Sequence, residues 1–221
     1  MRLIVFDCDG TLVDSQVGII TCAQAAFRAE GLAPPSAAAV RRIVGLSLVE
    51  AMQQLADDPD PALGLRLAES YKAAFIEYRS VPGFHEPLFP GTRELLDALL
   101  ERDLVLGVAT GKAMRGLRFV LEHHGLGHYF VTLQTADLHP SKPHPAMLQA
   151  AMAETGFEAA ATMLVGDTTF DILMARAAGA VPVGVSWGNH APHELIDAGA
   201  VRVLDRFEEL HQLLPEREPL I

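Results

Sequence analysis

Short apolar runs alternate with longer stretches of helical periodicity over most of this chain. The short runs are rich in valine, leucine and isoleucine, as in strands buried on both faces of a parallel sheet. The longer stretches repeat their apolar positions with a helical period. This alternation predicts an α/β protein with a parallel sheet. The predicted strands are Leu3–Phe6, Leu104–Ala109, Phe130–Leu133, Met163–Val165, Val181–Val185 and Val201–Val203.

Residues that end or begin helices support the same division. Gly125, Gly156 and Gly179 each follow a helical pattern, and glycine is the usual residue just past a helix end. Thr92 precedes a run with helical spacing of leucines and is expected to be the N-cap of that helix.

One segment breaks the alternation. Between Val17 and Arg79 the pattern is helical and contains no predicted strand. Proline and glycine return at residues 81–83, where a connection back to the sheet is expected. We therefore predict an α/β core domain of residues 1–15 and 82–221, with an all-helical cap domain inserted at residues 16–81.

Charge and apolar content narrow the classes of partner. The formal net charge is −11, which argues against nucleic acid or an anionic membrane surface as the main partner. No apolar stretch is long enough to span a bilayer, and Leu3–Phe6 is too short for a signal-peptide core. The cysteines, Cys8 and Cys22, lack metal-ligand spacing. We expect a cytoplasmic protein, monomeric or homodimeric, that acts on a small molecule.

Four polar motifs follow four different predicted strands. Each has an ordinary structural explanation when taken alone: a turn, a helix start, a solvated lysine or a helix N-cap. Lysine is nonetheless rare here, with three in the whole chain, so a lysine between strand and helix favours a function. The motifs are Asp7-Cys8-Asp9-Gly10, Thr110-Gly111-Lys112, Lys142-Pro143 and Gly166-Asp167 with Asp171.

The carboxyl ends of parallel strands meet at one edge of the sheet, so these motifs should converge there. Carboxylates gathered at that edge would repel each other by about 4 kcal/mol per close pair at an effective dielectric near 20. A divalent cation and a lysine would neutralise them. Oxygen ligands favour Mg²⁺ over zinc. The motifs therefore predict a magnesium site that binds a phosphate group.

In this order, the motifs resemble those of the haloacid dehalogenase superfamily of phosphatases. The resemblance covers nearly the full length and rests on the run from Asp7 to Ser15, Thr110-Gly111, Lys142-Pro143 and the Gly-Asp-x-x-x-Asp at residues 166–171. The position of the helical insertion is similar to that in phosphoglycolate phosphatase-like members. The resemblance implies a Rossmann-like α/β core and a Mg²⁺-dependent phosphatase that hydrolyses a small phosphomonoester, such as a phosphoglycolate-like compound or a sugar phosphate.

The resemblance also implies roles for the acidic residues. Asp7 would be the nucleophile, which forms a phospho-aspartate, and a magnesium ligand. Asp9 would protonate the leaving oxygen and later activate water, and its backbone carbonyl would bind the metal. Asp167 would bind Mg²⁺. Asp171 would bind it through water or orient Lys142.

The remaining motif residues would hold the phosphoryl group. By the same resemblance these are Thr110, the amide of Gly111 and Lys142.

Other reactions of the superfamily fit less well. Dehalogenases lack the second aspartate, so Asp9 argues against dehalogenation. Phosphonate-cleaving members need a cap lysine, but Lys72 stands later than that lysine is expected. A hexose-phosphate mutase shares all the motifs and stays an alternative, although an arginine is expected where Leu48 stands. From other classes, a catalytically silent metabolite-binding protein and a phospho-accepting signalling module are rivals that the complete motifs and the insertion disfavour.

Substrate specificity is expected to come from the cap. Arg42 could pair with a substrate carboxylate or second phosphate, beside Gly45 in the same segment. The alternative is that Arg42 is a solvated helix residue. In the core, residues 187–190 follow a predicted strand and could form part of the rim.

Overall fold

A six-stranded sheet with every neighbouring pair parallel forms the centre of the larger domain. The computed structural model describes residues 2–58 and 60–214. The strand order is β3-β2-β1-β4-β5-β6. From β1 the sheet is extended toward one edge by β2 and β3 and toward the other edge by β4, β5 and β6. The strands are β1 (Leu3–Phe6), β2 (Val105–Thr110), β3 (Phe130–Thr135), β4 (Thr162–Gly166), β5 (Val181–Val185) and β6 (Arg202–Leu204).

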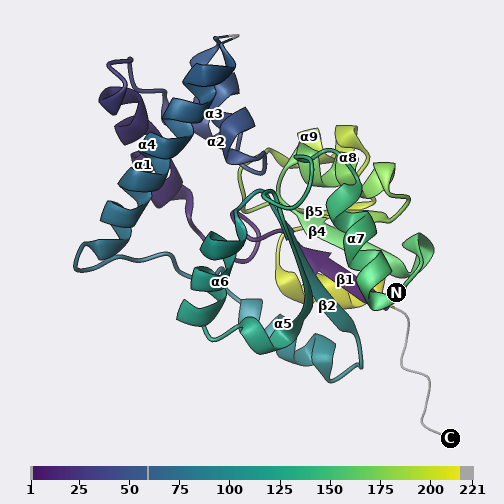
Figure 1. Cartoon of the computed structure of the whole chain (residues 1–221). Coiled ribbons are helices and arrows are strands. Elements are labelled where there is room, and N and C mark those ends of the chain that lie inside the picture. The colour runs from purple at the N-terminus through teal and green to yellow at the C-terminus, as the bar shows by residue number, and fades with distance from the viewer. Residues whose placement is uncertain (1, 59, 215–221) are drawn as a thin grey trace, which may run out of the picture.

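Helices cover both faces of this sheet (Figure 1). One face packs against α5 (Thr92–Leu100), α6 (Met114–His123) and the 3-10 segment Phe207–Leu213, in a core that includes Phe6. The opposite face packs against α7 (Ala146–Thr155) and α8 (Thr169–Ala177). The remaining core helix, α9 (Pro192–Ala198), packs beside α8. The predicted α/β fold class with a parallel, Rossmann-like sheet is confirmed.

All six predicted strands are present, with small shifts at their ends. The prediction of Thr92 as a helix N-cap is wrong, because Gly91 takes that position with a φ of +82°, which favours glycine. The buried Thr92 hydroxyl instead donates to the carbonyl of Phe89 at 2.8 Å.

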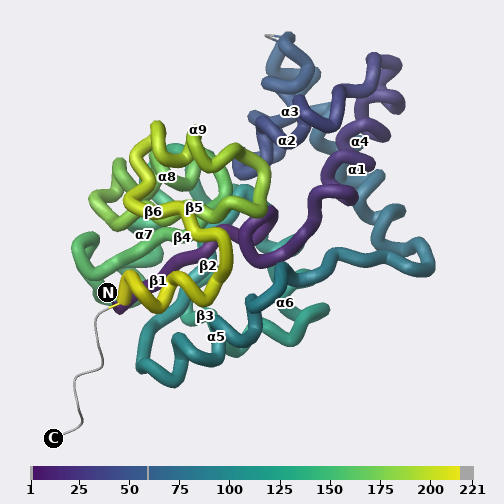
Figure 2. Tube along the Cα trace, turned by 180° about the vertical axis from the view of Figure 1, so that it is seen from behind, coloured from purple at the N-terminus to yellow at the C-terminus, as the bar shows by residue number. Residues whose placement is uncertain are grey.

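Four helices form a second group that stands apart from the sheet layers in both views (Figures 1 and 2). They pack around their own apolar core, to which Phe27, Met52 and Leu67 contribute. We propose residues 16–81 as the cap domain, since these helices share a core of their own. The helices are α1 (Gln16–Ala29), α2 (Ala37–Arg41), α3 (Leu48–Ala56) and α4 (Pro61–Ser80).

Within residues 2–58 and 60–214, no helix combines the length and the apolar character needed to cross a bilayer.

Candidate active site

The carboxyl ends of β1 and β4 bring three carboxylates together. Asp7 follows β1, Asp167 follows β4, and Asp171 lies in the first turn of α8. One oxygen of each lies within 4.8 Å of the others, and all three side chains are buried. Residues far apart in the sequence therefore form one acidic cluster at the edge of the sheet where the motifs were expected to meet.

Local backbone structure explains how the first motif enters the cluster. The amide of Asp7 donates to the carbonyl of Val165 on the neighbouring strand at 2.9 Å, which continues the strand pairing past Phe6. The chain then turns at Gly10, whose φ is +87°. A Cβ on Gly10 would lie 2.2 Å from Oδ2 of Asp167, so a side chain here would displace that carboxylate.

Lys142 joins two of the carboxylates. Its Nζ lies 2.9 Å from Oδ1 of Asp7 and 2.6 Å from Oδ1 of Asp171, and its side chain is fully buried. Burial disfavours the charged ammonium, but Asp171 and Asp7 outweigh it and raise the pKa of Lys142. One lysine cannot neutralise three carboxylates, so negative charge is left over in the cluster.

Burial and the neighbouring carboxylates both favour the protonated form of these carboxyl groups. Burial raises the pKa of Asp7 to about 8, although Lys142 acts in the opposite direction. Burial also raises the pKa of Asp167 to about 6, with Asp171 adding to the effect and Asn189 opposing it. Oδ2 of Asp7 is buried without a hydrogen-bond donor. An all-oxygen set with an unpartnered carboxylate oxygen fits a hard divalent cation.

Asp167 is held in place by neighbouring donors. Its Oδ1 accepts from the Thr11 hydroxyl at 2.9 Å, and its Oδ2 accepts from both the backbone amide and the side-chain amide of Asn189 at 2.8 Å. The sequence indicates that residues 187–190 lie near the rim, but it predicts no role for Asn189. The signal available was its place just beyond β5, at the same edge of the sheet.

Asp171 has donors on both of its oxygens. Oδ1 pairs with Lys142, while Oδ2 accepts from the backbone amide of Thr168 at 3.1 Å and from its hydroxyl at 2.7 Å, in a capping box that starts α8. Asp171 therefore contacts Lys142 and also belongs to the acidic cluster, so both roles expected for it stay predictions.

Asp9 points to a different set of partners. Its Oδ1 accepts from the Ser15 hydroxyl at 2.6 Å and lies 2.9 Å from Nζ of Lys112. Burial opposes the charge on Lys112, but Asp9 and other acidic neighbours raise its pKa overall. The sequence shows Lys112 only as part of its motif and does not predict this pairing, which depends on two strand ends lying side by side.

The second motif lies beneath the cap. Thr110 is buried at the end of β2, and its hydroxyl accepts from the amide of Lys112 at 3.3 Å. A Cβ on Gly111 would lie 2.5 Å from the carbonyl oxygen of Leu46 and 2.6 Å from that of Gly45. The segment that carries Gly45 is therefore packed directly on the predicted phosphate-binding turn.

Arg42 pairs with a residue of the core domain. Its guanidinium makes a 2.5 Å ion pair with Glu194 of α9, and its side chain is 55% exposed. The structure thus places Arg42 in a bridge between cap and core.

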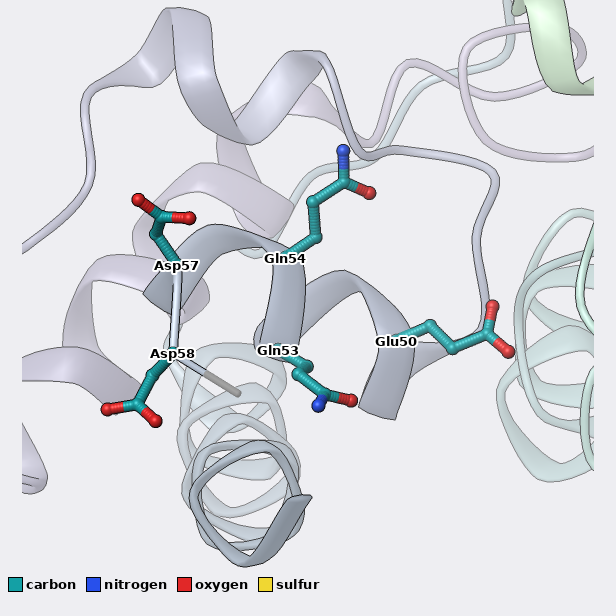
Figure 3. A pocket seen from close by; sticks show the side chains of 5 residues that line it. All are labelled: Glu50, Gln53, Gln54, Asp57 and Asp58. Carbon is teal, nitrogen blue, oxygen red and sulfur yellow. The ribbon is translucent and has the colours of Figure 1, made fainter. Parts of the chain in front are cut away.

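A separate hollow of about 460 Å³ opens on the cap (Figure 3). Its side chains come from α3 and the residues just after it, and none belongs to the carboxylate cluster. They are Glu50, Gln53, Gln54, Asp57 and Asp58.

Comparisons with known proteins identify the family of this chain. The model of a family described as haloacid dehalogenase-like hydrolase matches residues 4–185. The chain is 38% identical over 211 residues to a probable phosphatase IndB of Dickeya dadantii, covering 94% of this chain and 91% of that protein. It is 34% identical over 228 positions to a phosphoglycolate phosphatase of Rhodospirillum rubrum, covering 99% and 92%.

A solved structure extends the similarity to three dimensions. The crystal structure of a hydrolase from Pseudomonas syringae has a TM-score of 0.85 at 27% identity, covering 96% of this chain and 98% of that one.

Proposed function

Because the chain belongs to the haloacid dehalogenase-like hydrolases, we propose that it is a Mg²⁺-dependent phosphatase that hydrolyses a small phosphomonoester through a phospho-aspartate at Asp7. The family predicted from the motifs is confirmed, and so is the enzyme class, since the named relatives are phosphatases. The metal, the intermediate and the residue roles are proposed.

The observation that carries the proposal is the buried cluster of Asp7, Asp167 and Asp171 with a single lysine. Asp7, Asp167 and the backbone carbonyl of Asp9 would hold Mg²⁺. When bound, the metal would supply positive charge against the phosphoryl oxygens. The unpartnered Oδ2 of Asp7 supports this assignment, since a buried carboxylate oxygen without a donor is costly.

Asp7 is the proposed nucleophile. A carboxylate oxygen of Asp7 bonds to phosphorus while the bond from phosphorus to the ester oxygen breaks, and Asp9 gives its proton to that oxygen. Asp9 then takes a proton from a water molecule that attacks the same phosphorus. The acyl phosphate breaks at the bond from phosphorus to the Asp7 oxygen, which releases inorganic phosphate and restores both aspartates.

The phosphoryl group would be held by the Thr110 hydroxyl, the Gly111 amide and Lys142. These donors would stabilise charge on the oxygens that do not react, which is where most catalysis of phosphoryl transfer resides. Lys142 already contacts Asp7, so it would bring the nucleophile and the phosphoryl group together.

The substrate is proposed to be a small phosphorylated metabolite, either phosphoglycolate-like, as the names of relatives suggest, or a sugar phosphate. A mutase is disfavoured because Leu48 stands where an arginine is expected. The cytoplasmic location and the monomeric or homodimeric state stay predictions of the sequence.

The decisive experiment measures phosphate release from 2-phosphoglycolate and from an aryl phosphate, with and without Mg²⁺. Asp7→Asn is expected to lower kcat by at least about 10³-fold, because the amide is a poor nucleophile. Asp205→Asn, an exposed change of the same chemistry, is the matched control and should keep full activity. Full activity in Asp7→Asn, or no phosphatase activity in the wild type, would overturn the proposal.

A further inference from the structure

A second group of charged side chains lies where the cap meets the core, beside Asp9. The guanidinium carbon of Arg79, in the last turn of α4, lies 4.4 Å from the centroid of the Phe75 ring and 3.9 Å from that of Phe119 in α6. Nζ of Lys112 lies 5.6 Å from the centroid of the same Phe75 ring. One ring is therefore next to both cations, and Lys112 in turn contacts Asp9.

Two of the three guanidinium nitrogens of Arg79 have no hydrogen-bond acceptor. Its Nε and Nη2 are buried, and neither donates a hydrogen bond. The two aromatic rings attract the guanidinium through their faces, but they leave these N–H groups in its plane without acceptors. A buried donor without an acceptor destabilises the protein, so an acceptor is expected in the working enzyme.

Burial lowers the pKa of Arg79, and Glu86 is the acidic neighbour that most opposes this shift. Glu86 is buried, and its Oε1 also lacks a hydrogen-bond donor, so the two groups do not satisfy each other. Burial raises the pKa of Glu86, with Lys112 opposing this.

We propose that Arg79 and Lys112 bind an anionic group, such as a carboxylate, on the leaving alcohol of the substrate. This rests on the proposed function, in which Asp9 protonates the leaving oxygen. Lys142 contacts Asp7 on the phosphoryl side, whereas Lys112 contacts Asp9, so Lys112 and Arg79 lie on the side of the leaving group. The favoured class of substrate is a short phosphomonoester of a hydroxy acid. A neutral alcohol would leave the Arg79 donors unpaired.

The test compares two substrates that differ in this group alone. We would measure kcat and KM for 2-phosphoglycolate and for ethyl phosphate, in which a methyl group replaces the carboxylate. Comparing each variant with the wild type on the same substrate cancels the intrinsic reactivity of the ester. The variant is Arg79→Gln. The matched control is Arg66→Gln on the same helix, whose guanidinium makes an exposed ion pair with Glu30.

Arg79→Gln is expected to lower kcat/KM for 2-phosphoglycolate by at least about tenfold, mainly through KM, and for ethyl phosphate by less than about twofold. Arg66→Gln should change neither. Arg79→Lys, which keeps the charge, should retain part of the preference for the acid and gives a readout if the glutamine variant does not fold. Equal losses on both substrates, or no loss on either, would overturn the inference while leaving the phosphatase assignment intact. A wild type that hydrolyses neither substrate would instead remove the proposed function on which the inference rests.

Discussion

Lys142→Met gives a direct test of how the acidic cluster is held together. Lysine and methionine have similar length, so the change removes the ammonium with little change in packing. The variant loses contacts of 2.9 Å to Asp7 and 2.6 Å to Asp171, both fully buried. Removing one partner of a buried ion pair costs about 3–5 kcal/mol. For a chain of this size each kcal/mol lowers the Tm by about 2–4 °C, so we expect a fall of roughly 6–20 °C.

The dependence on pH identifies the cause of this loss. Without metal, the pKa of Asp7 is raised from 3.8 to about 8. The native state therefore binds more protons than the unfolded state in this window, and stability falls as pH rises through it. Losing Lys142 removes the interaction that lowers the pKa of Asp7, so in the variant the fall continues to higher pH. The deficit of the variant should thus change little between about pH 5 and pH 7 and grow as the pH rises through about 8, where Asp7 of the wild type ionises.

The assay is thermal unfolding in a buffer with a metal chelator across this pH range. Lys72→Met is the control, because Lys72 is 54% exposed and pairs with Glu69 one helical turn away. Exposed pairs of this kind contribute little, so the control should melt within about 2 °C of the wild type. If Lys142→Met also melts within that margin near pH 8, or if its deficit does not grow with pH, then Lys142 does not hold these carboxylates together.

Two further predictions concern the cation. Mg²⁺ at about a hundred times its Kd should stabilise the native state by about 2.7 kcal/mol and raise the Tm by roughly 5–10 °C, and an unchanged melting curve would argue against a preformed site. Asn189→Ala removes the side-chain amide that donates to Asp167 at 2.8 Å, so Mg²⁺ affinity measured by calorimetry should fall about 10–100-fold. Gln54→Ala, in the separate hollow on the cap, is the control for Asn189→Ala, and an equal fall in the two variants would contradict the assignment.

Much of the core is predictable because its signals are local. Each strand is a short apolar run, and the acidic motifs stand where those runs end, so periodicity alone places Asp7 and Asp167 at one edge of the sheet. Helix ends are harder to predict. Thr92 has the chemistry of an N-cap, but its hydroxyl is used for a turn at Phe89, and Gly91 adopts the conformation that the helix start requires.

The partners of the predicted residues are not predictable, because they depend on contacts between distant segments. The pairing of Lys112 with Asp9 and the support of Asp167 by Asn189 require two strand ends to lie side by side. The position of Arg42 in the cap suggests a substrate ligand. Its ion pair with Glu194 follows from how the cap rests on α9, which no local pattern in the sequence records.

The close fit of Gly111 under the carbonyls of Gly45 and Leu46 limits which cap domains can be joined to this core. A chimaera that carries the cap of another phosphatase must present a loop with the same clearance, or the foreign backbone will collide with the turn after β2. Conversely, a methyl group at position 111 would act as a wedge that holds the two domains apart. Engineering a new cap onto this core therefore begins with matching that one contact, before any residue of the substrate pocket is chosen.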